Sequence, residues 1–154
     1  TSFGTRVAEA WADRSDELSP TMKMKLILGQ YLIDEYHGQY YARAQNLRFD
    51  LKRAYDDALS TVDLLALPTT PQTAHPFRED VSTREAIRRG TNMAANTAPF
   101  DMTGHPAISI PCGTVDGLPA GLMLVGRQYD DATVLRAADA FQRVVDWQSR
   151  TAAD

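Results

Sequence analysis

Ser109, His105 and Cys112 are the residues of this chain whose types and spacing could support covalent catalysis. A serine or cysteine nucleophile needs a base beside it and donors for the oxyanion. His105 precedes Ser109 by four positions but sits between a glycine and a proline, so we expect it to close a turn. Ser109 alternates with isoleucines and is expected to be a strand hydroxyl bonded to backbone. Cys112 is expected to pack as a small apolar side chain. A nucleophilic role for Ser109 or for Cys112 is the alternative.

Other groups that could do chemistry do not gather along the sequence. The G-x-S-x-G motif that presents a nucleophilic serine is absent, as is a glycine-rich phosphate loop. The acidic pairs Asp34-Glu35, Asp56-Asp57 and Asp130-Asp131 fall where helix surfaces or caps are predicted, so they are expected to be solvated or capping. The three histidines and one cysteine lack metal-ligand spacing. We therefore predict no catalytic residue, no metal and no cofactor for this chain.

Charge and composition indicate which kinds of binding partner and which cellular location to expect. A net charge of −4 argues against nucleic acid or an acidic membrane surface, since either would favour a basic face. Apolar runs stay well short of the roughly 20 residues of a membrane span. The single cysteine suits a reducing cytoplasm. The chain starts without methionine or a secretory signal, and we expect it to be part of a longer protein.

Local signals predict four helices. Ser19 as cap and Pro20 at the first position start a helix to Tyr36, and a second helix, 39–61, follows the break at His37-Gly38. A capping box at 82–85 starts a third helix, which runs to about Ala95 and ends by Pro99 at the latest. Asp130 or Asp131 caps the last. The first two helices each have an apolar face that is expected to pack into a core. The face of the first helix is Met22, Leu26, Gly29, Ile33 and Tyr36, and the face of the second is Tyr40, Ala44, Leu47, Leu51, Ala54 and Ala58.

Three short apolar runs, 64–67, 107–110 and 122–125, lie between prolines and glycines and predict strands buried on both faces of a sheet. The resulting order of helices and strands is typical of an α/β fold. Three short strands make a thin sheet, so we expect them to have neighbours beyond this chain. Residues 1–154 form one segment, with 1–18 and 149–154 expected to be peripheral.

Four segments, taken in order, resemble the amidase signature family of serine hydrolases, which cleave carboxamides. They are KLILGQYLIDEYHGQYYARAQNLR, DLLALPTTPQTA, TAPFDMTGHPAISIPCG and GLPAGLMLVGRQYDDATVLRAADAFQ. The resemblance covers about 19–145 and implies the C-terminal portion of a mixed-sheet fold, with helices packed on a few short buried strands. The stretches SIPCG and GLMLVGRQYDDATVLRAA look most like enantioselective amidases of nitrile degradation.

The resemblance also implies that the catalytic groups are elsewhere. The family's two serines and lysine lie in a glycine- and serine-rich N-terminal stretch that nothing here matches, and Lys23, Lys25 and Lys52 fall on predicted helices. We therefore expect the isolated chain to be inactive and its partner to be the N-terminal portion of the same amidase. That portion would supply the serine nucleophile for hydrolysis of a carboxamide to carboxylic acid and ammonia. This chain would wall one side of the acyl pocket.

The predicted substrate wall follows from the position of the strand ends. Ligands of open α/β sheets collect beyond strand ends, where the irregular segments 69–72 and 97–100 lie. The substrate-binding residues predicted there, for a small carboxamide, are Thr69, Gln72, Thr97 and Phe100.

Two departures from the family's amidotransferases bear on the acyl group. Those relatives that make glutaminyl-tRNA usually carry asparagine where Asp101 stands, with an acidic residue near Ala94 and an arginine near Lys25. Because Ala94 cannot bind an ammonium group, a small or aromatic acyl group is favoured over glutamine. Carbon–nitrogen ligation with glutamine as donor is one alternative, and a non-catalytic interaction module or subunit is another. Exposed apolar surface is expected to make the chain self-associate as a homo-oligomer.

Overall fold

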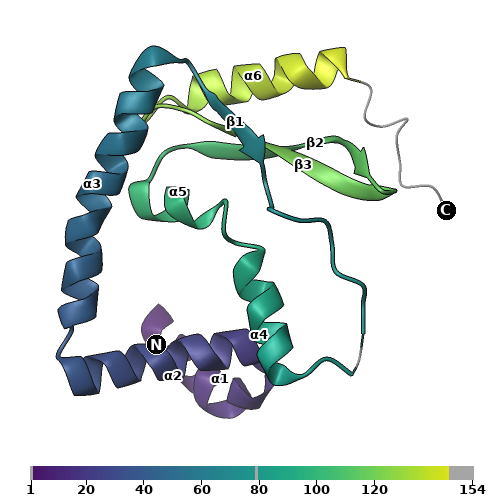
Figure 1. The fold of residues 1–154 in the computed structure, drawn as a ribbon. Helices are drawn as coiled ribbons and strands as arrows, with labels where there is room; N and C mark the ends of the chain where they lie inside the picture. The colour runs from purple at the N-terminus through teal and green to yellow at the C-terminus, as the bar shows by residue number, and fades with distance from the viewer. Residues whose placement is uncertain (1, 79, 146–154) are drawn as a thin grey trace.

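The structure, a computed structural model, describes residues 2–78 and 80–145. The elements, in chain order, are α1 (Phe3–Arg14), a 3-10 turn (Ser15–Glu17), α2 (Pro20–Tyr36), α3 (Gln39–Thr61), β1 (Leu65–Pro68), α4 (Thr83–Asn92), α5 (Ala98–Thr103), β2 (Ala107–Val115), β3 (Leu118–Val125) and α6 (Asp131–Val144). Figure 1 shows α6 along one face of the sheet and α5 on the other side. The long helix α3 connects α2, which lies far from the sheet, to β1.

The predicted helix starts are confirmed by their caps. The side chains of Ser19, Ser82 and Asp130 each accept a hydrogen bond of 3.3 Å from the backbone N–H three residues later. Each bond satisfies a donor that the first helical turn leaves free. The predicted break is also present, because His37 and Gly38 both have left-handed backbone conformations, with φ of 49° and 77°. The chain turns sharply there between α2 and α3 (Figure 1).

Two other helical regions differ from expectation. α1 is a helix that the sequence pattern did not predict, and none of its side chains is buried. α4 ends at Asn92 rather than near Ala95, which is before the limit predicted at Pro99, and Pro99 itself lies in the first turn of α5. Proline fits there because the first turn of a helix does not use its N–H groups. The predicted peripheral tail 149–154 lies outside the described residues.

The three strands form an antiparallel sheet in the order β1-β3-β2. β2 and β3 are a hairpin, and their turn residues Asp116 and Gly117 both have positive φ, as a type I′ turn requires. The apolar runs predicted only the parts of β2 and β3 farthest from this turn. Pro111 interrupted the pattern, yet it is tolerated within β2 because that strand is at the edge of the described sheet.

The central strand β3 is buried on both faces, as predicted. One core, on the side of α6, consists of Ile110, Leu124, Val134 and Ala138. The other, on the side of α5, consists of Phe100, Met123 and Val125, with Tyr55 of α3 against it. Alternation along β3 sends even-numbered side chains to one core and odd-numbered ones to the other. β1 and β2 are less completely covered than predicted, because alternate residues in β1 are exposed and β2 has one buried residue.

The predicted core faces of α2 and α3 are exposed, so that expectation is wrong for the described chain. Ile33 retains 58% of its accessible surface and Leu47 retains 57%. A side chain added at Gly29 would meet no atom within 4 Å, so the close approach expected there is absent. α3 instead buries Leu59, near its junction with the sheet. Periodicity identifies which side chains share a face, but it does not reveal what lies against that face.

Candidate functional site

The loop that follows β1 and residues 93–96, which directly precede the predicted wall segment 97–100, lie side by side at the end of β1. Asn96 Nδ2 donates a hydrogen bond of 2.9 Å to the carbonyl of Pro68, the last residue of β1. From the loop that follows β1, Gln72 Nε2 reaches Met93 Sδ at 3.5 Å. Chain segments more than 20 residues apart therefore share this edge of the sheet.

A pair of hydroxyl groups lies beside the central strand at this edge. Thr69 Oγ1 and Ser109 Oγ are 2.6 Å apart, and Thr69 N donates to the carbonyl of Gly121 at 2.9 Å. A Cβ at Gly121 would lie 2.8 Å and 2.9 Å from the two hydroxyl oxygens, so glycine leaves the space that the pair occupies. Ser109 was expected to bond backbone, whereas its partner here is the Thr69 side chain.

Gln72 is held in a defined orientation beside a hollow of about 410 Å³. Its Nε2 lies 2.8 Å from His75 Nε2, and its carbonyl accepts 2.8 Å from Thr70 Oγ1. The contact holds the side-chain amide of Gln72 against the imidazole ring of His75. Residues 70–73 line one side of the hollow, and Gly121 with its strand neighbours lines the other.

The remaining two predicted wall residues have different surroundings. Thr97 Oγ1 donates 3.3 Å to the carbonyl of Ala94 and so closes the turn before α5. Phe100 is 6% exposed, belongs to the core on the α5 side, and has its ring centroid 5.0 Å from that of Tyr55. The structure therefore brings Thr69 and Gln72 to one end of the sheet, beside the residues that precede Thr97, and places Phe100 in a core. Substrate contact by these residues stays a prediction.

Ser109 and Cys112 show no activating base among the described residues. The side-chain partner of Ser109 is a second hydroxyl, which can donate and accept hydrogen bonds but does not act as a base near neutral pH. Cys112 is half-buried at a bulge in β2, and its Sγ lies 3.4 Å from the carbonyl of Ala120. The geometry of this edge can bind and orient a polar group, and it contains no assembled nucleophile.

The surroundings of His105 were missed in the sequence. Its side chain is 0% exposed, with Nδ1 2.9 Å from Thr103 Oγ1 and Nε2 3.1 Å from Asp56 Oδ1. Lys52 Nζ lies 2.7 Å from the other oxygen of Asp56. The hydrogen bond from Lys52 is the main cause of the lowered pKa of Asp56, and His105 adds to it. Asp56, expected to be only solvated or capping, therefore has a tertiary role.

Nothing in the local sequence marks the His105–Asp56 contact, because 49 residues separate the two. His105 was expected to close a turn, and its bond to Thr103, two residues away, does so. The second ring nitrogen, Nε2, connects this turn to Asp56 of α3.

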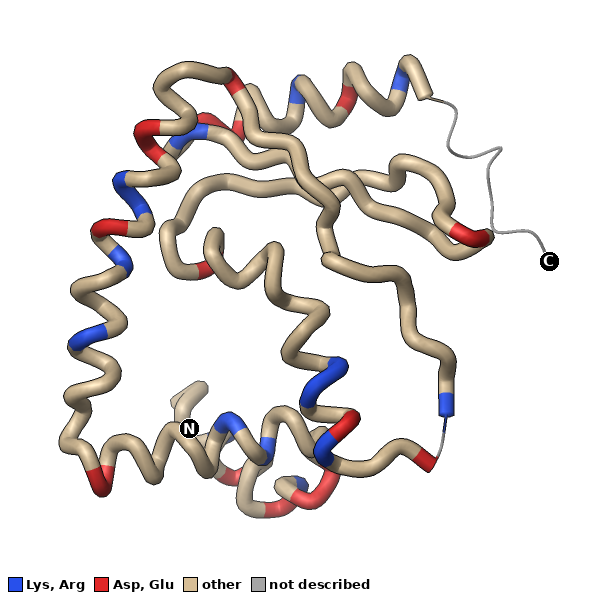
Figure 2. The backbone as a smooth tube through the Cα atoms, viewed as in Figure 1, with Lys and Arg blue, Asp and Glu red and all other residues tan. Residues whose placement is uncertain are grey.

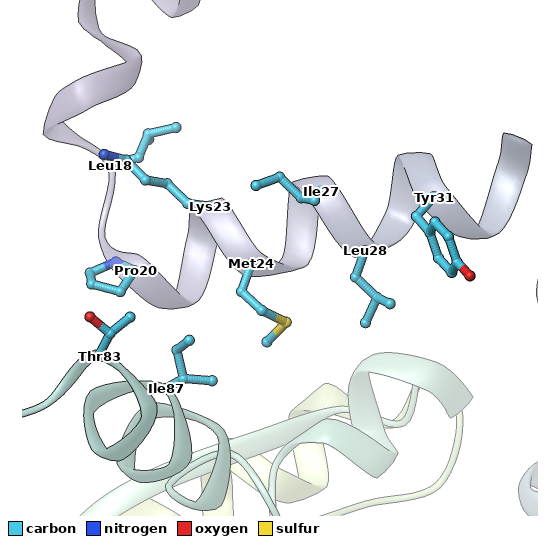
Figure 3. A pocket seen from close by; sticks show the side chains of 9 residues that line it. All are labelled: Leu18, Pro20, Lys23, Met24, Ile27, Leu28, Tyr31, Thr83 and Ile87. Carbon is cyan, nitrogen blue, oxygen red and sulfur yellow. The ribbon is translucent and has the colours of Figure 1, made fainter.

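A larger hollow, of about 690 Å³, lies between α2 and the start of α4. Figure 3 shows its lining, with Met24 of α2 and Ile87 of α4 on facing sides. Lys23 is the residue of this lining that is charged at neutral pH, and its Nζ donates a hydrogen bond of 2.9 Å to the carbonyl of Asp16. The lining offers apolar contact area and no group poised for acid–base chemistry.

The helices carry both acidic and basic residues, and the strands carry no charged residue, as Figure 2 shows. Within residues 2–78 and 80–145, no three His, Cys, Asp or Glu side chains are placed to hold a metal ion. Across the same residues, none of the helices has the length and apolar character needed to cross a membrane.

Known proteins match this chain over most of its length. The family model Amidase matches residues 5–135. A glutamyl-tRNA(Gln) amidotransferase subunit of Chloroflexus aggregans is 41% identical over 138 residues, which are 89% of this chain and 28% of that protein. An uncharacterized protein in the nthA 5′ region of Rhodococcus erythropolis is 44% identical over 131 residues, 84% of this chain and 66% of that protein.

The fold is also found among solved structures. A crystal structure of an amidase superposes with a TM-score of 0.61 and 26% identity, covering 90% of this chain and 31% of that one. This likeness confirms the expected α/β class, with the present chain as part of such a fold. The chain spans between about a quarter and two thirds of the length of these relatives. By its match over residues 5–135, the chain belongs to the amidase signature family.

Proposed function

We propose that this chain is the C-terminal portion of an amidase that hydrolyses a carboxamide to carboxylic acid and ammonia. The observation that carries the proposal is the family match over residues 5–135. The serine nucleophile and its lysine base belong, in this proposal, to polypeptide outside the present sequence. Support for that division comes from Ser109, whose described partner is a hydroxyl and not a base. The single cysteine leads us to propose the cytoplasm as the location.

Within such an enzyme, the edge formed by residues 69–72 and 97–100, with residues 93–96 beside them, is proposed to wall the acyl pocket. Its polar groups are uncharged hydroxyls and amides, which suit a neutral carboxamide. Ala94 is half-buried in this edge and offers a methyl group where an ammonium-bearing substrate would need a carboxylate. We therefore propose a small or aromatic acyl group without a cationic amine.

The test joins this chain to the N-terminal portion of the enzyme, either covalently or by co-expression. The joined protein should release ammonia from propionamide or benzamide, whereas this chain alone should release none and should resist a fluorophosphonate probe. Ser109→Ala serves as control and should retain turnover in the joined protein. Fluorophosphonate labelling of Ser109 in the isolated chain would overturn the assignment of the nucleophile to another segment.

Glutamine-dependent amide transfer is the second candidate, favoured by the identity of 41% to a glutamyl-tRNA(Gln) amidotransferase subunit. Comparing ammonia release from glutamine with release from benzamide separates the two functions. Under our first proposal, benzamide or propionamide is preferred, and Ala94→Glu shifts preference toward glutamine by supplying a carboxylate. Preference of the unchanged protein for glutamine would favour the amidotransferase.

The exposed apolar faces of α2 and α3 favour a partner, which we propose to be the N-terminal portion of the same amidase. Isolated, the chain is expected to self-associate and to bind a hydrophobic dye, because large exposed apolar patches mark interaction surfaces. Co-expression with the N-terminal portion should lower dye binding and restore activity together. A monodisperse, dye-negative monomer would instead support a self-sufficient, non-catalytic module.

A further inference from the structure

We propose that His105 is a positioning residue that ties α3 to the end of α5 and so orients the wall segment 97–100, most of which lies in α5. The tie consists of Asp56 on α3, the ring of His105, and Thr103 at the end of α5. The link between this tie and substrate preference rests on the proposed amidase function. The mechanical part of the inference, the tie itself, stands on the described contacts alone.

The donor in the contact with Asp56 follows from the chemistry of the groups. An ionised carboxylate can only accept, so His105 Nε2 carries the hydrogen and donates it to Asp56. The pairing of Asp56 with Lys52 lowers the pKa of the carboxyl and keeps it ionised. Nδ1 meets the hydroxyl of Thr103, which can donate or accept. Both ring nitrogens of a fully buried side chain are thus satisfied.

The tie holds a segment whose backbone is constrained from several directions. Gly104 adopts a left-handed conformation, with φ of 74°, and its N–H donates 2.8 Å to the carbonyl of Phe100. The carbonyl of Thr103 accepts 2.8 Å from Gln128 Nε2. His105 follows directly and adds the connection to α3. Movement of its ring would therefore be transmitted to α5, which bears Phe100.

Tyr55 gives the tie a second contact with the same helix. Its ring centroid is 5.9 Å from that of His105 and 5.0 Å from that of Phe100. Tyr55 and Asp56 are neighbours on α3, so the aromatic contact and the hydrogen bond share one turn of helix. Without the carboxylate of Asp56, a buried N–H of His105 would have no acceptor. Because a buried unpaired donor is costly, we expect the ring and the end of α5 to move.

The experiment compares Asp56→Ala and Asp56→Asn with the adjacent control Asp57→Ala, whose carboxylate is exposed. All are measured in the enzyme that contains this chain. Hydrogen exchange at the Gly104 amide reports on the end of α5, and the ratio of kcat/KM for benzamide over propionamide reports on the wall. Asp56→Ala should accelerate exchange and change the ratio by about fivefold each, the factor expected for one lost hydrogen bond. Asp56→Asn, which keeps an acceptor oxygen, should stay within about twofold of the unchanged protein.

A second measurement addresses the ring itself. Nitrogen-15 shifts of His105 should show the hydrogen on Nε2, and Thr103→Val should accelerate exchange at Gly104 even if Asp56→Ala fails to fold. A hydrogen on Nδ1 alone, or equal behaviour of Asp56→Ala and Asp57→Ala, overturns the inference. So does unchanged exchange in Thr103→Val. If the unchanged enzyme hydrolyses no amide, the proposed function fails, while exchange and ring shifts still decide the role of His105.

Discussion

The sheet half of this molecule, β1–β3 with α5 and α6, contrasts with its helical half, α1–α4. The sheet half contains two buried cores, one on each face of β3. Among the described residues of α1–α4, Leu59 is the buried one. Both halves have apolar residues at regular spacing. The difference teaches that amphipathic sequence predicts a face able to pack, while burial depends on a second surface.

That second surface is present for β3 and absent, among the described residues, for much of α2 and α3. α6 covers one face of the sheet, and α5 with the end of α3 covers the other. α2 meets α4 and the start of α3, which leaves its apolar side chains partly open. The exposed apolar residues of the two long helices include Ile27, Leu28, Tyr31, Ile33, Tyr41, Leu47 and Phe49.

The largest expected effect is on core packing, tested by one substitution made in each half. Leu124→Ala removes a side chain that is 7% exposed, and Leu47→Ala removes one that is 57% exposed. Denaturant unfolding should give a loss of about 2–5 kcal/mol for Leu124→Ala and about 0.5 kcal/mol or less for Leu47→Ala. Similar losses for both in the isolated chain would show that the helical face is packed. A large loss for Leu47→Ala only beside the N-terminal portion would locate the partner.

Glycines give the next contrast. Gly121→Ala places a Cβ within 3 Å of both Thr69 Oγ1 and Ser109 Oγ and should cost about 1–3 kcal/mol of unfolding free energy. Gly29→Ala, in open space on α2, should stabilise by about 0.5–1 kcal/mol through helix propensity. Thermal melts of both variants provide the measurement. Adding Ser109→Ala should recover part of the loss in Gly121→Ala, and no recovery would place the strain elsewhere.

A smaller effect is expected at Cys112, although it lies in the sheet half. Its Sγ makes a hydrogen bond with the carbonyl of Ala120 that is weak because a thiol is a weak donor, and its bulge position makes it less enclosed than β3. Cys112→Ala should change the unfolding free energy by about 1 kcal/mol or less and leave turnover of the joined enzyme within a few-fold. A loss of turnover of about a thousandfold with binding intact would identify the cysteine as catalytic.

The smallest effect is a pH dependence at the start of α4. Hydrogen bonds from Arg88 and Arg89 lower the pKa of Glu85 from 4.5 to about 2. Because the folded pKa is the lower one, the stabilisation is present above pH 4.5 and is lost as pH falls toward 2. Glu85→Gln should flatten this part of the stability–pH curve. The control Ser82→Ala removes the cap but not the carboxylate, so it should lower the unfolding free energy and keep the slope against pH. If Glu85→Gln keeps the same slope as the unchanged protein, the ion pairs of Glu85 are not the source of that slope.

The helix bounds could be predicted because the interactions that start and end a helix involve residues close together in the sequence. Ser19 with Pro20 starts α2, and His37-Gly38 separates α2 from α3, through caps and backbone conformations that act within a few residues. The sequence predicted only part of each hairpin strand. Pro111 ends the apolar run in β2, although the strand itself continues beyond it. Edge position permits that proline, and edge position is a tertiary property.

By itself, the sequence determined the family, the bounds of α2 and α3, and the apolar cores of the three strands. The tertiary structure alone decided that the loop 69–72 and the segment before α5 share one edge, and that Asp56 meets His105 across 49 residues. It also decided that Phe100 lies in a core. Backbone conformation and capping depend on neighbouring residues, whereas contacts between distant segments depend on how whole elements pack. Their partners therefore cannot be assigned from local spacing.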